Sequence, residues 1–436
     1  MRAAGVCALL LAACAARQKM DLKTAQADLA AGRAGDAQHE FEEILRDDPR
    51  ELAAIRGRVE AARKGGGLGA LAREAQDAVS ARPGDALAWY FAGLVAFGQG
   101  DEAQAVTALR KAATLQPREG DIQYRLGVAL LQGEKFVEAR EPLSQAAQLG
   151  PRVARYRPPL ALCLWRNGDR KAAIDALRGF TELSPSPDEA ALAVKTARSI
   201  TDLFRDVPPA ARAELEAALG FLSHEAPGVA RPQLEALLAR LPDLPAAHAL
   251  LGLAEARLDE SGHAVTELRR AAELAPDLPQ PHAWLAELFA SKDRADLASV
   301  EYTEAIARNP LDPEVLRHLG ELRLTRALPG ALPPLREAAV LLPEDDSLQL
   351  LLARAELAAG EPAPARGRLE RLSKRRPDDP EVLLRLAMLL FDDRARADTA
   401  ARDELGRKIE KLLEKVLTLQ PENAAANRLL GALRAG

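Results

Sequence analysis

Hydrophobic and small residues recur at helical spacing along two consecutive stretches of the chain, 87–97 and 103–113. A polar turn that contains Gly98, Gly100 and Asp101 separates them, and Pro117 follows the second stretch. Because proline cannot continue a helix, it marks the end of the unit. The pattern predicts two antiparallel helices joined by a tight turn.

The sizes of the side chains in this unit predict how its helices pack. Gly93, Ala105 and Ala112 are small, as required where two helix backbones approach closely. Trp89 and Leu109 are large enough to fill the remaining space. The unit is therefore expected to bury its large residues against its own glycine and alanine positions.

Prolines repeat along the chain with the length of this unit. Those at 49, 83, 117, 151 and 185 recur at an even interval of about 34 residues, as do those at 242, 276 and 310. The next two, at 343 and 377, follow at nearly the same interval. Units of this kind stack into one continuous body, so the chain is expected to form a solenoid and not separate globular domains.

The same small and large residues recur at matching places in the repeats. The glycines are Gly93, Gly127, Gly252 and Gly320; the alanines are Ala37, Ala105, Ala139, Ala173, Ala230, Ala264, Ala298, Ala331 and Ala365. The large residues are Phe41, Leu109, Leu143, Leu177, Leu234, Leu268, Tyr302, Leu335, Leu369 and Leu413. In period and residue order the stretch from Lys19 to Pro421 resembles the tetratricopeptide repeat. The resemblance implies an all-α, right-handed superhelical solenoid of about eleven helix-turn-helix repeats.

Two intervals depart from the period. Pro185 and Pro242 are about 57 residues apart, and the segment 188–204 between them is typical of an amphipathic helix without a partner. This helix is either a joint that changes the direction of the superhelix or a degenerate repeat. Pro377 and Pro421 are about 44 residues apart, and the excess at 392–402 is either a solvated loop or an extension of the flanking helices. The last residues resemble the first half of another repeat, which would cap the array.

Composition supports the all-α class and argues against nucleic acid as a partner. Hydrophobic residues make up 48% of the chain and aromatic residues only 4%, with alanine and leucine abundant, which favours helices over a sheet. The formal net charge is -5, and its 59 basic and 64 acidic residues are mixed throughout. No basic stripe points to nucleic acid, so that partner class is set aside.

The first residues, MRAAGVCALLLAACAA, predict a targeting segment. One arginine precedes an apolar run that is too short to span a bilayer but long enough for a signal peptide. The run ends in Leu11-Ala12-Ala13-Cys14, which resembles the lipobox of bacterial lipoproteins. That resemblance implies cleavage before Cys14, a lipid anchor on its thiol and, with Ala15 following, the periplasmic side of the outer membrane. The alternative is an uncleaved chain in the cytoplasm.

These observations divide the chain into five expected parts. They are a signal peptide at 1–13, a first array of about five repeats at 14–187, an inserted helix at 188–210, a second array of about six repeats at 211–423 and a capping helix at 424–436.

Catalytic and metal-binding patterns are not expected to carry the function. The six histidines are scattered along the chain, and His248 and His282, one repeat apart, are interpreted as packing residues. Cys163 lies in an apolar helical run and is interpreted as a buried small hydrophobic residue. The prediction is therefore a chain that is not an enzyme, with no catalytic residues, no metal and no cofactor.

The resemblance places part of each repeat's first helix on a concave face. The residues that fall there, and that we expect to line a partner-binding groove, are Tyr90, Leu94, Phe97, Tyr124, Val128, Leu131, Leu162, Trp165, Leu215, Leu219 and Leu222. Their apolar and aromatic character suits an extended peptide or an amphipathic helix. The alternative is that any one of them packs against a neighbouring helix.

The function that follows is a non-catalytic scaffold for protein–protein interaction. The resemblance to a lipoprotein implies a lipid-anchored envelope protein that assembles an outer-membrane, pilus or secretion, or polysaccharide-export complex. Alternatives are a cytoplasmic scaffold or adaptor and an accessory subunit of a polysaccharide-modifying enzyme. Partner identity and oligomeric state are not predicted.

Overall fold

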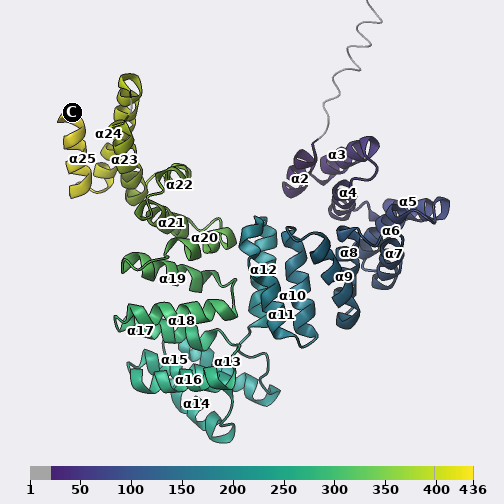
Figure 1. Ribbon diagram of the computed structural model, residues 1–436, viewed down its shortest axis with the longest axis horizontal. Helices are drawn as coiled ribbons and strands as arrows, with labels where there is room; N and C mark the ends of the chain where they lie inside the picture. The colour runs from purple at the N-terminus through teal and green to yellow at the C-terminus, as the bar shows by residue number, and fades with distance from the viewer. Residues whose placement is uncertain (1–20, 397, 436) are drawn as a thin grey trace, which may run out of the picture. The chain divides into compact units, whose positions relative to one another are not determined.

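The structure is a computed structural model that describes residues 21–396 and 398–435, and Figure 1 shows its helices. The expected signal peptide at 1–13 and the lipid-anchor residue Cys14 lie outside the described residues. Within them the chain is all-α, without a strand, which confirms the predicted fold class. None of the described helices combines the length and the apolar character needed to cross a membrane.

The protein divides into two compact units, Met1–Ala176 (unit 1) and Leu177–Gly436 (unit 2). The helices of unit 1 are α2 Leu22–Ala30, α3 Ala34–Asp47, α4 Leu52–Gly65, α5 Leu68–Ala81, α6 Ala86–Gln99, α7 Glu102–Leu115, α8 Gly120–Gln132, α9 Phe136–Leu149, the 3-10 helix η1 Ala154–Tyr156, α10 Arg157–Arg166 and α11 Arg170–Leu177, which ends at the boundary.

Unit 2 continues the series of helix pairs. Its helices are the 3-10 helix η2 Phe180–Leu183, α12 Pro187–Ile200, α13 Pro209–Ser223, α14 Pro227–Arg240, α15 Pro245–Arg257, α16 Ser261–Leu274, α17 Gln280–Ser291, α18 Ala295–Arg308, α19 Pro313–Thr325, α20 Leu332–Leu341, α21 Asp346–Ala358, α22 Pro362–Arg375, α23 Pro380–Arg394, α24 Thr399–Leu419 and α25 Ala424–Ala435.

Capping residues at the turns explain where these helices begin and end. Asp85 accepts a hydrogen bond from the backbone N–H of Leu87 at 3.0 Å, which satisfies a free donor at the start of α6. At the other end, Gly100 adopts φ +80°, a left-handed conformation that suits glycine and turns the chain into α7. Gly100 and Asp101 therefore lie at the predicted turn, whereas Gly98 belongs to α6.

The predicted contact is confirmed for the leucines but not for Trp89, which is half-buried and donates from Nε1 to the backbone oxygen of Pro83 at 2.8 Å. A Cβ atom added at Gly93 would lie 2.5 Å from Cγ of Leu109, and one added at Gly127 would lie 2.4 Å from Cγ of Leu143. Both distances are far below a van der Waals contact, so only glycine lets these leucines pack between the paired helices. The large residues of the repeat register are all buried.

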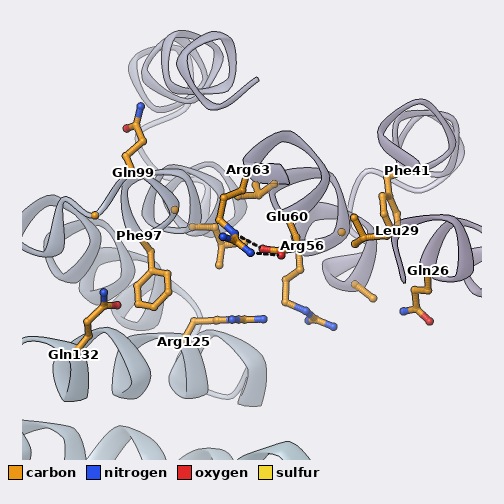
Figure 2. A pocket seen from close by; sticks show the side chains of 16 residues that line it. Gln26, Leu29, Phe41, Arg56, Glu60, Arg63, Phe97, Gln99, Arg125 and Gln132 are labelled. Carbon is orange, nitrogen blue, oxygen red and sulfur yellow. Dashed lines mark hydrogen bonds and ion pairs between the residues drawn. The ribbon is translucent and has the colours of Figure 1, made fainter. Parts of the chain in front are cut away.

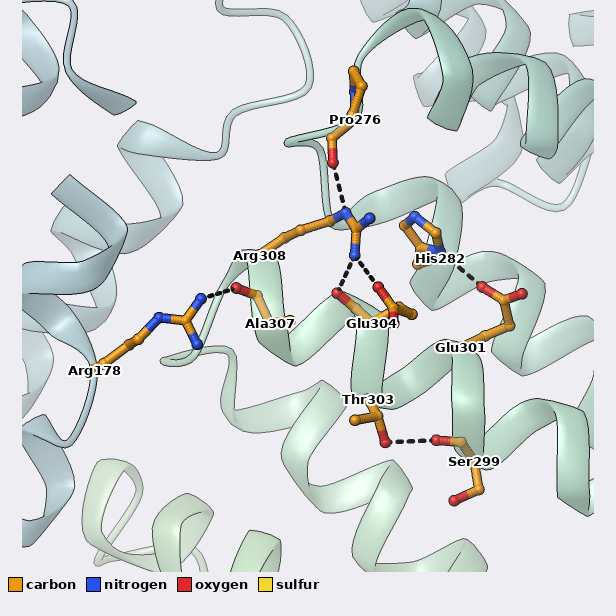
Figure 3. A network of polar contacts seen from close by, with 9 residues as sticks. All are labelled: Arg178, Pro276, His282, Ser299, Glu301, Thr303, Glu304, Ala307 and Arg308. Atoms are coloured by element: carbon orange, nitrogen blue, oxygen red, sulfur yellow. Dashed lines mark hydrogen bonds and ion pairs between the residues drawn. The ribbon is translucent and has the colours of Figure 1, made fainter. Parts of the chain in front are cut away.

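The inserted helix has a partner, contrary to the expectation of an isolated helix. Helix α12 packs against α20, which lies far along the sequence within unit 2. After α12 the backbone oxygen of Thr201 accepts a hydrogen bond from Gln280 Nε2 at 2.7 Å. Before it, Arg178 donates to the backbone oxygen of Ala307 at 2.8 Å, as Figure 3 shows. The segment folds back along the helix pairs that follow it.

The second irregular interval is resolved in favour of helix extension. Helix α23 continues to Arg394, and α24 begins at Thr399 and runs for 21 residues. Helix α25 then places Ala426, Leu430 and Leu433 in the apolar cluster built by α23 and α24. These contacts cover apolar surface of the last complete helix pair.

Candidate functional site

Unit 1 contains a pocket of about 780 Å³ between the first helices of its repeats. Most of its lining comes from α4, α6 and α8, with Gln26 and Leu29 added from α2. Apolar lining is provided by Leu94 and Phe97 near the end of α6. Figure 2 shows the pocket, with Gln26, Leu29 and Phe97 among the labelled lining residues.

The charged lining of this pocket consists of three arginines and one glutamate. Glu60 forms a two-point pair with Arg63, with N···O distances of 2.7 and 2.6 Å, so these two charges offset each other. Arg56 and Arg125 remain, and their side chains point toward each other in Figure 2. The pocket therefore has a positive side next to an apolar one.

Arg56 is held in place by a buried carboxylate, that of Asp121. This residue is 3% exposed. Its Oδ2 lies 2.7 Å from Nη1 of Arg56, and its Oδ1 lies 2.7 Å from Nη2 of Arg155. Tyr90 donates its hydroxyl hydrogen to the same carboxylate. One carboxylate thus binds two guanidinium groups and one hydroxyl, so both of its oxygens accept hydrogen bonds.

These contacts determine the protonation of the network. Burial alone would raise the pKa of Asp121, but the charges of Arg56, Arg125 and Arg155 and the hydroxyl of Tyr90 lower it below the ordinary value. Burial and the nearby carboxylate raise the pKa of Tyr90. Asp121 is therefore ionised and Tyr90 neutral at neutral pH, and the network keeps a net positive charge.

Arg125 differs from Arg56 and Arg63, the other two arginines of the pocket, because it makes no ion pair with the described residues. Its guanidinium carbon lies 5.4 Å from the ring centroid of Tyr124, a cation–π distance. Its Nε is buried without a hydrogen-bond partner. Arg125 thus has donors left for a group that enters the pocket.

The lining suits one chemical class of ligand. Guanidinium groups bind carboxylates through paired hydrogen bonds, and Arg125 has that capacity free. Phe97 and Leu94 can bury an apolar side chain, while Gln99 and Gln132 can bond to the backbone of an extended segment. The pocket therefore fits a peptide that carries a carboxylate beside an apolar residue.

The structure corrects the expected exposure of five groove residues. Those that are buried are Tyr90, Leu94, Tyr124, Leu215 and Leu222. Tyr90 is fully enclosed and bonded to Asp121, and the ring of Tyr124 packs 5.0 Å from that of Tyr156. Leu215 and Leu222 belong to the core of α13, α14 and α15. These five side chains therefore pack against neighbouring helices and do not present an exposed concave face.

The other groove residues keep part of their surface. Those that are half-buried are Phe97, Val128, Leu131, Leu162, Trp165 and Leu219. Of all eleven, only Leu94 and Phe97 line the pocket of unit 1. Partner binding by these residues stays a prediction.

The arginines and Asp121 were missed by the sequence analysis, although a signal for them exists. Arg56, Tyr90 and Tyr124 follow one another at intervals of one repeat, and Arg155 follows Asp121 at the same interval. Equivalent positions of adjacent repeats lie side by side in a solenoid. A search for charge pairs at one repeat's spacing would have found the pair of Asp121 and Arg155, but not Arg56 or Tyr90.

Histidine and cysteine residues elsewhere agree with their structural interpretation. His248 Nδ1 lies 2.6 Å from Glu267 Oε2, and His282 Nδ1 lies 2.7 Å from Glu301 Oε2 one repeat later (Figure 3). Cys163 is fully buried, as predicted. Burial raises the pKa of its thiol, which disfavours the reactive thiolate.

Comparisons with known proteins agree with the repeat architecture. A family model described as tetratricopeptide repeat matches residues 69–116, 90–154 and 125–188, and a second one with the same description matches 346–389. No curated protein matches the sequence.

Several solved structures are similar in fold at low identity. PilF of Pseudomonas aeruginosa is 20% identical, with 51% of this chain and 96% of that chain covered and a TM-score of 0.40. YrrB, a TPR protein with an unusual peptide-binding site, is 15% identical, with 45% and 96% covered and a TM-score of 0.39. The hetero-tetramer Cut9–Hcn1 of the APC/C contains a chain that is 13% identical, with 94% and 95% covered and a TM-score of 0.31.

The family matches cover residues in both units, and the contacts of Gly93 with Leu109 and of Gly127 with Leu143 lie within the matched range 69–188. The protein therefore contains tetratricopeptide repeats and has the architecture of a scaffold for protein–protein interaction.

Proposed function

We propose that the protein binds a segment of a partner protein in the pocket of unit 1 and so holds that partner in a larger assembly. The segment carries a carboxylate, from an acidic side chain or a free C-terminus, next to an apolar residue. The observation that supports this is Arg125, a partly buried guanidinium beside Phe97 that makes no ion pair with the described residues.

Charge supports the choice of an acidic segment over a purely apolar one. The pocket lining and the Asp121 network together hold Arg56, Arg63, Arg125 and Arg155 against Glu60 and Asp121, an excess of two positive charges. Such an excess attracts a negatively charged segment and makes its binding sensitive to salt. The proposed ligand thus differs from the apolar segment expected from the sequence by its added carboxylate.

A library of extended nine-residue peptides, with free or amidated C-termini, tests the proposal. We expect selected peptides to be enriched in aspartate or glutamate beside leucine or phenylalanine, and their affinity to fall as salt rises. Enrichment only with free C-termini would identify the terminal carboxylate as the ligand group. Selection of uncharged peptides with salt-independent affinity would contradict the proposal.

Arg125→Gln provides the decisive variant. Its affinity for a selected peptide should fall about tenfold or more, equivalent to about 1.4 kcal/mol, because it removes the charge that the ligand neutralises. The matched control is Arg110→Gln, which changes an exposed arginine of α7 that pairs with Glu138 at 2.6 Å. Equal affinities of the two variants would place the binding site elsewhere.

We also propose that Cys14 carries a lipid anchor, so that this scaffold works at the cell envelope, in an outer-membrane, pilus or secretion, or polysaccharide-export complex. The apolar run that ends at Leu11-Ala12-Ala13-Cys14 supports this proposal. Fatty-acid labelling with membrane fractionation of the native protein and of Cys14→Ser tests it. Loss of label and membrane association with Cys14 would support the anchor, whereas an unlabelled, soluble native protein would favour the cytoplasmic scaffold.

A further inference from the structure

Three acidic residues are buried within the described part of the chain, and only one of them lacks a cationic partner. Asp121 is paired with Arg56 and Arg155, and Glu356 is paired with Arg368. Glu255, near the end of α15, is 5% exposed, and no ion pair or hydrogen bond reaches its carboxylate from the described residues. An ionised carboxylate in such a place is costly without a positive partner.

Glu356 is a buried carboxylate at the equivalent position of another repeat, and it has a cationic partner. Glu255 and Glu356 are equivalent, because each stands at the same place after the proline that ends the preceding repeat, Pro242 or Pro343. Arg368 holds Glu356 through two contacts, Nη2 to Oε1 at 2.9 Å and Nε to Oε2 at 3.2 Å. The residue equivalent to Arg368 in the α15–α16 repeat is Glu267, which adds a negative charge in place of a positive one.

Glu267 is itself engaged with another residue. It pairs with His248, and the next repeat contains the same arrangement in His282 and Glu301 (Figure 3). In that next repeat, the residue equivalent to Glu255 is Phe289, so no buried carboxylate lies beside the pair. The lone buried carboxylate is thus specific to the α15–α16 repeat.

Two further metal-ligand side chains lie next to Glu255. Glu260 is the N-cap residue of α16 and His263 lies in its first turn. One potential ligand atom from each of Glu255, Glu260 and His263 lies within 4.8 Å of the other two. Glu260 and His263 are three residues apart, a spacing that places both on one helix face and that the sequence analysis overlooked.

We propose that Glu255, Glu260 and His263 bind one divalent transition-metal ion of the zinc class. An imidazole nitrogen and two carboxylate oxygens are ligands that Zn²⁺ accepts, and water would complete its coordination. The buried carboxylate of Glu255 gains the positive partner that Arg368 gives Glu356. The ion links the end of α15 to the start of α16 and so braces this helix pair.

The geometry requires only a small adjustment. Donor atoms around a tetrahedral zinc ion lie about 3.3 Å apart, because each lies about 2.0 to 2.2 Å from the metal. The side chains of Glu260 and His263 are 36% and 73% exposed, so they can rotate toward Glu255 and an ion can enter from solvent. Burial first, and then the charge of Glu267, raise the pKa of Glu255, while the charges of His263 and Arg231 act in the opposite direction.

One neighbouring cation competes with the metal. Arg231 of α14 lies with Nη1 2.7 Å from Oε1 of Glu260, and its Nε lies 2.8 Å from Oε1 of Glu235. Metal binding has to displace or share the first of these contacts. Removing Arg231 should therefore strengthen metal binding, whereas removing a metal ligand should weaken it.

Calorimetric titration of the full chain with ZnCl₂ tests the proposal, with Cys7 and Cys14 changed to serine in every variant so that their thiols do not bind zinc. We expect one Zn²⁺ per protein molecule. Glu255→Gln and His263→Gln should each weaken the affinity by at least about tenfold, since even outer-shell changes cost 10- to 100-fold. Arg231→Gln should tighten it severalfold.

The matched control is His224→Gln, which removes an exposed histidine of unit 2 whose Nδ1 contacts the backbone oxygen of Gly220. It should leave zinc affinity unchanged. Thermal unfolding supplies a second readout: zinc should raise the Tm of the parent and of His224→Gln, but not of Glu255→Gln. Absence of saturable zinc binding, or binding that survives Glu255→Gln undiminished, would overturn the proposal. It is independent of the peptide pocket, because the two sites lie in different units and are measured with different ligands.

Discussion

The pocket region of unit 1 and the α15–α16 repeat of unit 2 both bury a carboxylate, but they surround it differently. Asp121 has two arginines and a tyrosine hydroxyl around it, whereas Glu255 has another acid, Glu267, at the place where an arginine could stand. The first carboxylate orients side chains that line a pocket. The carboxylate of Glu255 can bind a metal ion.

The comparison teaches that the residue supplied by the second helix of a repeat determines the surroundings of a buried carboxylate on the first helix. Glu356 and Glu255 occupy equivalent positions, and the residue on the second helix decides their environment. Desolvation is similar for both, since they are 1% and 5% exposed. The partner, and not the position, therefore determines whether the carboxylate is structural or available.

The largest effect is expected for Asp121→Asn. This change removes the charge that offsets Arg56 and Arg155 and should lower the free energy of unfolding by about 3 to 5 kcal/mol, as is typical when a buried pair loses one partner. Urea unfolding followed by circular dichroism measures it. The exposed Asp77→Asn in α5 serves as control and should change stability by less than about 0.5 kcal/mol. A loss below about 1 kcal/mol for Asp121→Asn would mean that the network does not stabilise unit 1.

Opposite signs are expected for the same substitution in the two equivalent repeats. Glu356→Gln leaves Arg368 without its carboxylate and should cost about 2 to 4 kcal/mol, less than Asp121→Asn because one guanidinium group loses its partner and not two. Glu255→Gln removes a buried charge without a partner and should leave the metal-free protein unchanged or up to about 2 kcal/mol more stable. Unfolding in EDTA compares the two. Equal destabilisation by both changes would show that Glu255 has a partner after all.

Acidification should weaken unit 1 through Asp121. The folded-state pKa of Asp121 lies below its ordinary value of 3.8, so the unfolded chain takes up the proton first as pH falls. Its contribution is complete above that value and is lost as pH drops through the folded-state pKa. The stability difference between the native protein and Asp121→Asn should therefore narrow below about pH 4. A difference that stays constant down to about pH 2 would contradict the assigned ionisation.

The smallest effect on stability is expected for Arg125→Gln. Arg125 makes no ion pair with the described residues, so its loss should change the free energy of unfolding by no more than about 0.5 kcal/mol while it weakens peptide binding. Urea unfolding measured beside the peptide titration separates the two properties. A loss of several kcal/mol would assign Arg125 to the core and not to the pocket.

The periodic sequence was sufficient to predict the helix pairs and their internal packing. Gly93 against Leu109 and Gly127 against Leu143 follow from size and spacing alone, because both partners belong to one local hairpin. The proline period likewise located the irregular segment at 188–204, where α12 lies. Contacts between the two helices of one repeat can therefore be predicted from the order of residues.

The exposure of the groove residues was decided only by the tertiary structure. Periodicity places Tyr90 and Tyr124 on one stripe of their helices, but the same stripe faces both the concave surface and the next repeat. Packing between successive first helices buries both tyrosines, while Phe97 reaches the pocket from the end of α6.

The sequence by itself determined an all-α repeat architecture, the register of its small and large residues and the stretches where the period breaks. Tertiary structure alone decided that α12 packs on α20, that Asp121 collects arginines from two other repeats, and that the carboxylate of Glu255 is buried. The physical reason is range: helix formation and hairpin packing depend on neighbours along the chain. The partner of a buried charge depends instead on which residues the stacked repeats bring together.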